Sequence, residues 1–270
     1  MTEPSELKEL LESIRGTYGY DFTEYAESSV KRRIGHFMTS NKIDSLGRLG
    51  KALVADEAFF ERFVQEITVN VTEMFRNPGF YESLRKNIVS RLATYPLIKI
   101  WIAGSSTGEE LYSLAILLKE EGLLDRSVIY ATDINQKALQ SAREGVYSNR
   151  NIQHYAENYL KSGGKTELSD YYKTKYDAIL LDRSLKRNVV FAFHNLAVDR
   201  SFNEFQLILC RNVLIYFNQS LQNKVLNLFY ESLCPFGYLG LGNKESLLFA
   251  DRKKAFEELV PREKIYVKIS

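Results

Sequence analysis

LIKIWIAGSSTGEELYSLAILLKEEG, residues 97–122, contains a short apolar run, a loop with two glycines and an amphipathic segment in direct succession. In the amphipathic segment Leu114, Ala115 and Leu118 fall on one face of a helix. An uninterrupted apolar strand that leads directly into such a helix is typical of a parallel sheet, because helices cover both faces of that kind of sheet. We therefore expect a strand at 97–104 at the centre of a doubly wound α/β fold.

The same alternation continues along the chain. A second strand and helix are expected in VIYATDI and NQKALQSAREGVY (128–147), and a third pair in FNEFQLILCRN (202–212) and SLQNKVLNLFYESLCPFG (220–237). Pro235 and Gly237 are expected to end the third helix. YLGLG (238–242) and EKIYVKIS (263–270) are expected to close the sheet as further strands. The pattern predicts a Rossmann-like domain.

Two regions do not show this alternation of strands and helices. Residues 1–75 carry apolar side chains at helical spacing with no strand-like alternation, which predicts an N-terminal all-helical domain and linker before the α/β domain at 76–270. Residues 165–200 predict a small inserted antiparallel β-subdomain, in which Asp177–Leu181 and Asn188–Phe193 form a hairpin. Such a subdomain would dock a partner protein, or it would serve as a brace that covers the edge of the sheet.

Composition excludes several classes of protein. The chain holds 36 Lys and Arg against 34 Asp and Glu, a net charge of +2, which is too small for a general nucleic-acid binder. It contains no apolar run of membrane-spanning length, and its acidic, amphipathic start is unlike a signal peptide. The three histidines and two cysteines lack the spacing of metal ligands. We therefore expect a cytoplasmic monomer that is not embedded in a membrane and has no metal site.

The ends of the first two strands suggest a ligand. In a doubly wound sheet, ligands bind at the carboxyl ends of the strands. Small residues from Gly104 to Gly108 let the backbone approach a ligand, and Asp133 ends the second strand where a carboxylate accepts hydrogen bonds from ribose hydroxyls. The loop lacks the GxGxxG spacing of a pyrophosphate site, and Glu109 and Glu110 would repel phosphate. An adenosine ligand without pyrophosphate, such as S-adenosylmethionine, fits best. Alternatively, Glu110 only stabilises the helix start and Asp133 only caps the next helix.

Longer motifs resemble one known family. They are KRRIGHFM (31–38), TVNVTEMFR (68–76), IAGSSTGEELYSLA (102–115), ATDIN (131–135), AREGVY (142–147) and CRNVLIYF (210–217). Their order and spacing resemble the CheR methyltransferases over nearly the whole chain. The second and last motifs are the most specific, because a generic methyltransferase does not need them.

The resemblance implies a protein-glutamate O-methyltransferase that uses S-adenosylmethionine and acts on the cytoplasmic helical domain of methyl-accepting chemotaxis receptors. It implies cofactor contacts from Asn70, Thr72, Arg76, Glu110, Asp133, Asn195, Leu196, Arg211 and Asn212. Arg76 and Tyr216 are the expected catalytic residues, which would orient the acceptor carboxylate. Asn70 and Thr72 are alternatively helix caps, Arg76 a surface ion-pair residue and Tyr216 part of the core.

The sequence departs from the family at three places. Leu111 stands where the family usually has proline, GLGNKESL (240–247) replaces a Gly-His-Ser-Glu run, and the 165–200 segment is long for the family. A nucleic-acid methyltransferase is disfavoured because the third strand ends in Cys210-Arg211-Asn212-Val213, without the Asn/Asp-Pro-Pro-aromatic motif. A non-catalytic signalling module that binds S-adenosylmethionine would share the same pocket residues and remains an alternative.

A basic helix is expected at 28–40. Its apolar face leaves Lys31, Arg32, Arg33 and His36 on other faces. These cations would dock a Glu-rich receptor helix, or they would form an ordinary solvated face.

Overall fold

Four helices form the first part of the chain in the computed structural model, which describes residues 4–68 and 70–269. They are α1 (Pro4–Tyr18), α2 (Glu27–Ser40), α3 (Leu46–Ala55) and α4 (Glu57–Ile67). Ser45 and Asp56 cap α3 and α4 by accepting hydrogen bonds from backbone N–H groups of the first turn. Leu49, Leu53 and Phe63 are fully buried in the core between these helices. The predicted all-helical N-terminal domain is confirmed.

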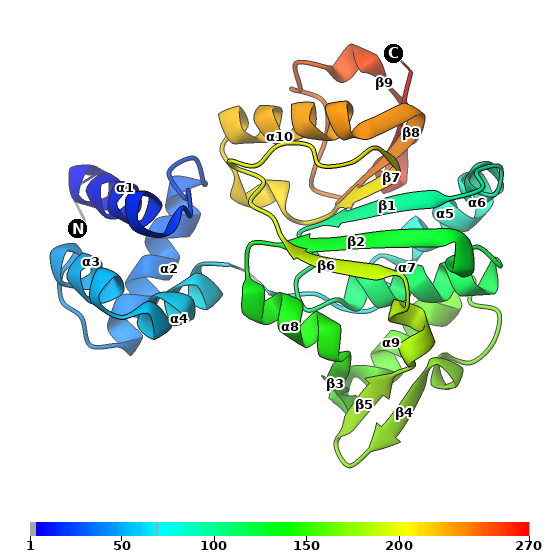
Figure 1. Cartoon of the computed structure of the whole chain (residues 1–270), viewed down its shortest axis with the longest axis horizontal. Coiled ribbons are helices and arrows are strands. Elements are labelled where there is room, and N and C mark those ends of the chain that lie inside the picture. The colour runs from blue at the N-terminus through cyan, green and yellow to red at the C-terminus, as the bar shows by residue number, and fades with distance from the viewer. Residues whose placement is uncertain (1–3, 69, 270) are drawn as a thin grey trace.

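A seven-stranded sheet forms the centre of the second domain (Figure 1). Its order is β6-β2-β1-β7-β8-β10-β9. The strands are β1 (Ile98–Ala103), β2 (Ser127–Asp133), β6 (Val189–Phe193), β7 (Phe205–Cys210), β8 (Leu233–Leu241), β9 (Phe256–Val260) and β10 (Ile265–Lys268). The five neighbouring strands β6, β2, β1, β7 and β8 pair in parallel, while β10 runs antiparallel to both of its neighbours, β8 and β9. This arrangement confirms the predicted Rossmann-like fold.

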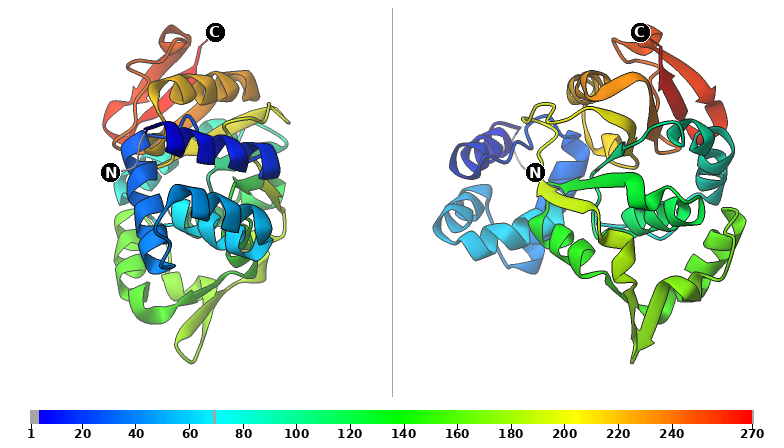
Figure 2. Two further views of the ribbon diagram at one scale, coloured as in Figure 1. Left: turned by 90° about the vertical axis from the view of Figure 1, so that its left-hand side faces the viewer. Right: turned by 45° about the vertical axis from the view of Figure 1, so that its right-hand side comes forward.

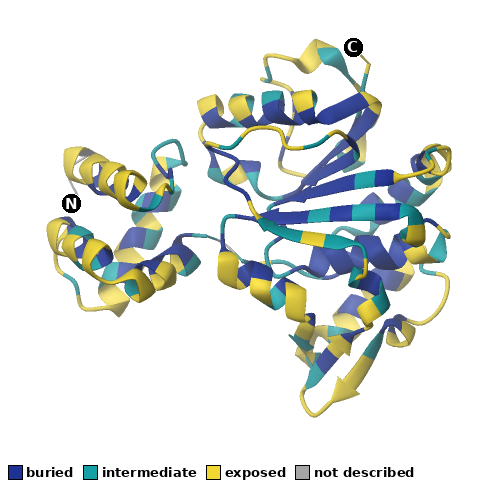
Figure 3. Cartoon of the chain, in the orientation of Figure 1, coloured by how far each residue is buried: buried dark blue, intermediate teal, exposed yellow. Residues whose placement is uncertain are grey.

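Alternate side chains of β1 enter two different cores, as the pleat of a strand requires. Ile100 and Ile102 pack with α5 (Pro78–Asn87), α6 (Val89–Leu92) and α7 (Glu109–Glu120). Trp101 and Ala103 pack on the opposite face with α10 (Gln219–Ser232). Both faces of the central strands are therefore covered, and Figure 3 shows these strands as mostly buried. Burial on both faces explains their continuous apolar sequence.

A second, three-stranded sheet lies beyond α8 (Gln136–Glu144), in the order β3-β5-β4. Its strands are β3 (Val146–Ser148), β4 (Tyr172–Lys175) and β5 (Ala178–Leu181), all antiparallel, and α9 (Ile152–Lys161) lies between β3 and β4 in the sequence. Figure 2 shows this sheet extending away from the main one. A small antiparallel sheet was predicted and is present.

The predicted hairpin between Asp177–Leu181 and Asn188–Phe193 is wrong. β5 pairs with β3 and β4, whereas β6 pairs in parallel with β2 and forms an edge of the main sheet. The charged turn between them is a single 3₁₀ turn, Arg183–Lys186, that carries the chain from one sheet to the other. In the main sheet all five residues of β6 pair with β2, and a strand in a larger sheet is more stable than one in an isolated two-stranded hairpin. The inserted sheet therefore spans β3 to β5 and ends before β6.

The predicted end of the third helix is also displaced. α10 ends at Ser232, and Pro235 and Gly237 lie within β8, where a register irregularity interrupts its pairing with β7. Proline is tolerated at such an irregularity because no ladder hydrogen bond is required of it. None of the helices within residues 4–68 and 70–269 is long and apolar enough to cross a membrane.

Candidate functional site

The loop after β1 passes close to the end of β7. Gly104 has a φ of 81°, and a Cβ atom there would lie 2.5 Å from Cγ2 of Val213. Gly108, with a φ of 96°, begins α7, and its Cβ would lie 2.8 Å from the Cβ of Ala142. Only glycine accommodates both the left-handed backbone and this contact distance. Glycine is therefore required at both positions of this loop by backbone conformation and packing.

Asp133 lies at the end of β2, with both carboxylate oxygens held by backbone N–H groups. Ser106 donates to Oδ2 and Asn135 donates to Oδ1, each at 2.8 Å. The side chain that caps α8 is Asn135, which accepts from Ala138 at 3.0 Å. The alternative in which Asp133 caps this helix is therefore wrong. Burial raises the pKa of Asp133, while the backbone N–H groups oppose this rise.

Glu110 and Arg211 form a buried ion pair at the far end of the pocket. Nη1 of Arg211 donates to Oε1 of Glu110 at 2.8 Å, and Nη2 donates to the carbonyl oxygen of Arg76 at 3.0 Å. The Arg211 guanidinium also lies 4.1 Å from the ring centroid of Phe80. Burial disfavours the charge of Arg211, but Glu110 together with Tyr81 and Glu245 outweighs burial, so the pKa of Arg211 is raised. The neighbouring Glu109 instead accepts from the Thr107 hydroxyl at 2.6 Å.

The linker between the domains contributes Asn70, Thr72 and Arg76 to the pocket, while Val69 of the same motif lies outside the described residues. Oδ1 of Asn70 accepts from the Ser106 hydroxyl at 3.2 Å, which joins the linker to the loop after β1. Neither Asn70 nor Thr72 caps a helix, because the following helix, α5, begins after Asn77. Arg76 is half-buried and donates to the carbonyl oxygen of Val71 at 3.2 Å.

The loop after β7 is held by a residue that the sequence did not single out, Glu245. This buried carboxylate accepts from the backbone N–H groups of Gly242 at 2.6 Å, Asn212 at 2.9 Å and Ile215 at 3.3 Å. It fixes Asn212 in a left-handed conformation, with a φ of 61°, just before the 3₁₀ turn Leu214–Tyr216. An acidic residue four positions after the end of the apolar β8 was the available signal. Tyr216 is half-buried and lines the pocket, so it is not an ordinary core residue.

The segment after β6 forms another wall. Leu196 is buried, and Oδ1 of Asn195 accepts from Ala197 at 3.0 Å, whereas its Nδ2 is buried and has no partner among the described residues. Nδ1 of His194 is likewise buried without a partner there. Burial lowers the pKa of His194, which favours the neutral imidazole.

One residue lies elsewhere than expected. Arg33 was placed with Arg32 on an outer charged face of its helix, but its side chain lines the pocket and packs over Tyr216. Arg32 is exposed, as expected. Helical periodicity separates apolar from polar faces, but it does not reveal that another domain packs against part of the polar face.

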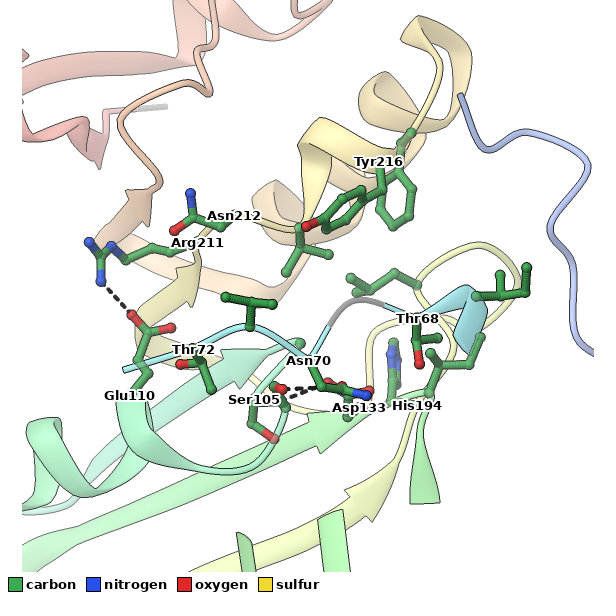
Figure 4. A pocket seen from close by; sticks show the side chains of 18 of the residues that line it. Thr68, Asn70, Thr72, Ser105, Glu110, Asp133, His194, Arg211, Asn212 and Tyr216 are labelled. Atoms are coloured by element: carbon green, nitrogen blue, oxygen red, sulfur yellow. Dashed lines mark hydrogen bonds and ion pairs between the residues drawn. The ribbon is translucent and has the colours of Figure 1, made fainter. Parts of the chain in front are cut away.

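All ten residues expected from the sequence line one pocket. Figure 4 shows this pocket, with Asn70, Thr72, Glu110, Asp133, Arg211, Asn212 and Tyr216 labelled among the expected residues. The pocket holds about 980 Å³ of space, part of it open to solvent, which suits a small-molecule ligand. Asn195, Ser105 and Arg211 line it, and each has one buried polar atom, Nδ2, Oγ and Nε respectively, without a protein partner in the described structure. Such atoms require partners, and the acceptors of an adenine base and an amino-acid carboxylate would supply them. The residues present therefore fit S-adenosylmethionine. No group of metal-ligating side chains lies among the described residues.

Comparisons with known proteins agree with this geometry. Residues 70–263 match the family described as CheR methyltransferase, SAM binding domain, and residues 5–68 match the CheR methyltransferase all-alpha domain. A putative methyltransferase, Cher3, from Pseudomonas putida is 46% identical, with 97% of this chain and 96% of the relative covered. Chemotaxis protein methyltransferases are 31% identical in Listeria monocytogenes (87% of each chain) and 34% identical in Vibrio parahaemolyticus (91% of this chain and 89% of the relative).

Both domains of the chain are thus matched in order, and the matched cofactor domain contains the pocket residues Asp133, Glu110 and Arg211. The chain belongs to the CheR family of S-adenosylmethionine-dependent methyltransferases.

Proposed function

We propose that this protein transfers the methyl group of S-adenosylmethionine to glutamate side chains in the cytoplasmic helical domain of methyl-accepting chemotaxis receptors. The observation that carries the proposal is the composition of the pocket wall around Tyr216. Among the described residues, the pocket has the cations Arg33 and Arg76 beside this phenol and no lysine. Its carboxylates already have partners, because Glu110 pairs with Arg211, Asp133 accepts from backbone N–H groups and Glu73 contacts His154. Nε2 of His194 lies at the carbonyl oxygen of Arg200. Positive charge without an evident general base suits an acceptor that is already anionic. The names of relatives that are chemotaxis protein methyltransferases support the same substrate class.

Glutamate meets this requirement because its reference pKa of about 4.3 leaves it ionised near neutral pH. One carboxylate oxygen forms the new bond to the methyl carbon while the bond from that carbon to sulfur breaks. The electron pair of the broken bond stays on sulfur, the products are a methyl ester and a neutral thioether, and no proton moves. The protein therefore needs to position the two reactants and to exclude water.

The pocket residues fall into two groups, those that would bind the cofactor and those that would orient the acceptor glutamate. S-adenosylmethionine, when bound, supplies the electrophilic methyl group. Asp133 would accept from its ribose hydroxyls, Glu110 would hold its amino group, and Asn195 with Leu196 would border the adenine. Asn70, Thr72, Arg211 and Asn212 complete the cofactor wall. Arg76 and Tyr216 would orient the acceptor carboxylate, and a modest contact is expected, because strong pairing in the ground state would slow the reaction.

The test is to incubate the protein with S-adenosylmethionine labelled in the methyl group and with purified receptor cytoplasmic fragments. Transfer of label that is released by mild alkali, and that is lost when the receptor glutamates are replaced by alanine, is expected for methyl esters. Alkali-stable label would indicate a different acceptor atom. Cofactor binding without any transfer would favour the non-catalytic signalling module.

A further inference from the structure

Arg33 reaches the pocket from the helical domain, although its neighbour Arg32 on α2 is exposed to solvent. The Arg33 guanidinium carbon lies 4.9 Å from the centroid of the Tyr216 ring. Nη1 of Arg33 donates a hydrogen bond to the carbonyl oxygen of Ile67, the last residue of α4. Two consecutive arginines therefore have different surroundings, and only Arg33 faces the site.

Backbone pairing between the domains fixes this arrangement. Tyr25 and Phe217 form an isolated antiparallel bridge, and their rings lie 4.9 Å apart. The N–H of Ala26 donates to the carbonyl oxygen of Tyr216 at 2.8 Å, and the N–H of Asn218 donates to that of Glu24 at 2.9 Å. These contacts enclose Tyr216 and end directly before α2, so the helix that carries Arg33 is held against the loop that carries Tyr216. The position of Arg33 is thus set by the domain interface.

Arg33 lacks a carboxylate partner. No Asp or Glu oxygen among the described residues lies within 4.0 Å of its guanidinium, in contrast to Arg211, which pairs with Glu110. Burial lowers the pKa of Arg33, which reflects partial loss of water around its charge. A guanidinium has five N–H donors; the bond to Ile67 uses one of them, and the side chain of Tyr216 is a second hydrogen-bond partner. The remaining donors and the uncompensated charge favour an anion at this side of the pocket.

We propose that Arg33 binds the carboxylate of the acceptor glutamate beside the hydroxyl of Tyr216, and that the helical domain thereby supplies a catalytic residue. This inference rests on the proposed function and names a residue that selects its substrate. A cation favours a carboxylate over the neutral amide of glutamine, so Arg33 would distinguish the two side chains at the same position of a receptor helix. It also gives a reason why the helical domain is joined to the cofactor domain by backbone pairing at Tyr216.

The experiment compares Arg33→Met and Arg33→Lys with a matched control, Arg48→Met. Arg48 lies in the same domain on α3 with its side chain 74% exposed, away from the pocket. A charge-assisted hydrogen bond contributes about 1.5–3 kcal/mol, so Arg33→Met should lower kcat/KM for a receptor fragment by about tenfold to a hundredfold. Arg33→Lys should recover part of the loss because it keeps the charge. Affinity for S-adenosylhomocysteine, measured by calorimetry, should stay within about twofold in all three variants.

A second measurement does not depend on methyl transfer. N-acetylglutamate and N-acetylglutamine are titrated into the protein saturated with S-adenosylhomocysteine, and binding is followed by NMR. The wild type and Arg48→Met should bind N-acetylglutamate in preference to the amide, and Arg33→Met should lose that preference.

The outcomes separate the two proposals. If the wild type methylates no receptor fragment but still prefers N-acetylglutamate through Arg33, the receptor assignment fails and the carboxylate site stands. The Arg33 proposal is overturned if the wild type shows no preference between the two compounds. It is equally overturned if Arg33→Met weakens cofactor binding as much as it lowers kcat/KM, because Arg33 would then be structural.

Discussion

Nη1 of Arg211 lies 2.8 Å from Oε1 of Glu110, and this ion pair joins the end of β7 to the first turn of α7 at the wall of the cofactor pocket. The two side chains are separated by 101 positions in the sequence. The pair neutralises the charge of Arg211 inside the protein, and its geometry leaves Oε2 of Glu110 for a ligand.

Replacement of Arg211 by methionine should lower the free energy of unfolding by about 3–5 kcal/mol, because it leaves the Glu110 carboxylate buried without its partner. The double variant Glu110→Met, Arg211→Met should recover much of this loss. Denaturant unfolding of the wild type, both single variants and the double variant measures the coupling. Additive losses would show that the two residues stabilise the fold independently.

Replacement of Asp133 by asparagine should weaken binding of S-adenosylhomocysteine by about 1.5–3 kcal/mol, since ribose hydroxyls would lose a charged acceptor. Burial raises the pKa of Asp133 above 3.8, and the bound state requires the ionised form. The dissociation constant of the wild type should therefore increase as the pH falls through this raised pKa, because the proton must be removed on binding. Calorimetry across that pH range should show a much weaker dependence for Asp133→Asn. An equal dependence in both proteins would assign the titration to another group.

Replacement of Glu245 by alanine should cost about 1–3 kcal/mol of stability, because the buried N–H groups of Gly242 and Asn212 would lose their acceptor. The neighbouring Lys244 is exposed, and Lys244→Ala is the control. Burial raises the pKa of Glu245 above 4.5, so the folded protein holds this proton more tightly than the unfolded chain does. The contribution of Glu245 should therefore decline as pH rises from 4.5 through the raised value. Thermal unfolding at several pH values tests both statements, and a stability equal to that of Lys244→Ala would contradict them.

Replacement of Arg32 by glutamate should raise the KM for the receptor fragment and make it less sensitive to salt, because this exposed cation would attract a Glu-rich receptor helix. Arg48→Glu is the control, and cofactor affinity should not change in either variant. If Arg32→Glu abolishes cofactor binding, the helix has a structural role instead.

The inserted sheet gives a prediction about partner docking. β4 is an edge strand of that sheet, and Lys173 and Lys175 on it are exposed. If an extended acidic peptide of the receptor adds to this edge, the double variant Lys173→Glu, Lys175→Glu should raise the receptor KM and leave cofactor affinity unchanged. Lys137→Glu, an exposed position on α8, is the control. Unchanged methylation kinetics would show that this edge does not dock the receptor and that the inserted sheet serves only as a structural brace.

The sequence by itself determined the all-helical first region and the main alternation of strands and helices, and its resemblance to the family gave ten residues that line the pocket. Continuous apolar strands such as 97–104 and helical spacing in 1–75 follow from local patterning, which depends on neighbours a few positions away. The polar residues Asp133, Arg211 and Asn212 follow strands whose carboxyl ends meet at one edge of a parallel sheet, so their convergence could be predicted without a structure.

Only the tertiary structure decided the partners of these elements. Each of β5 and β6 has the composition of a strand, but composition does not determine which distant strand is the partner, and β6 pairs with β2 instead of β5. Arg33 and Arg32 are equally polar, but only Arg33 faces the pocket, because the contact between Tyr25 and Phe217 holds its helix against the loop that carries Tyr216. Glu245 accepts a hydrogen bond from the backbone N–H of Asn212 because the loops after the neighbouring strands β7 and β8 meet at the end of the sheet. Long-range contacts of this kind are set by the packing of whole domains, and local sequence preference does not contain them.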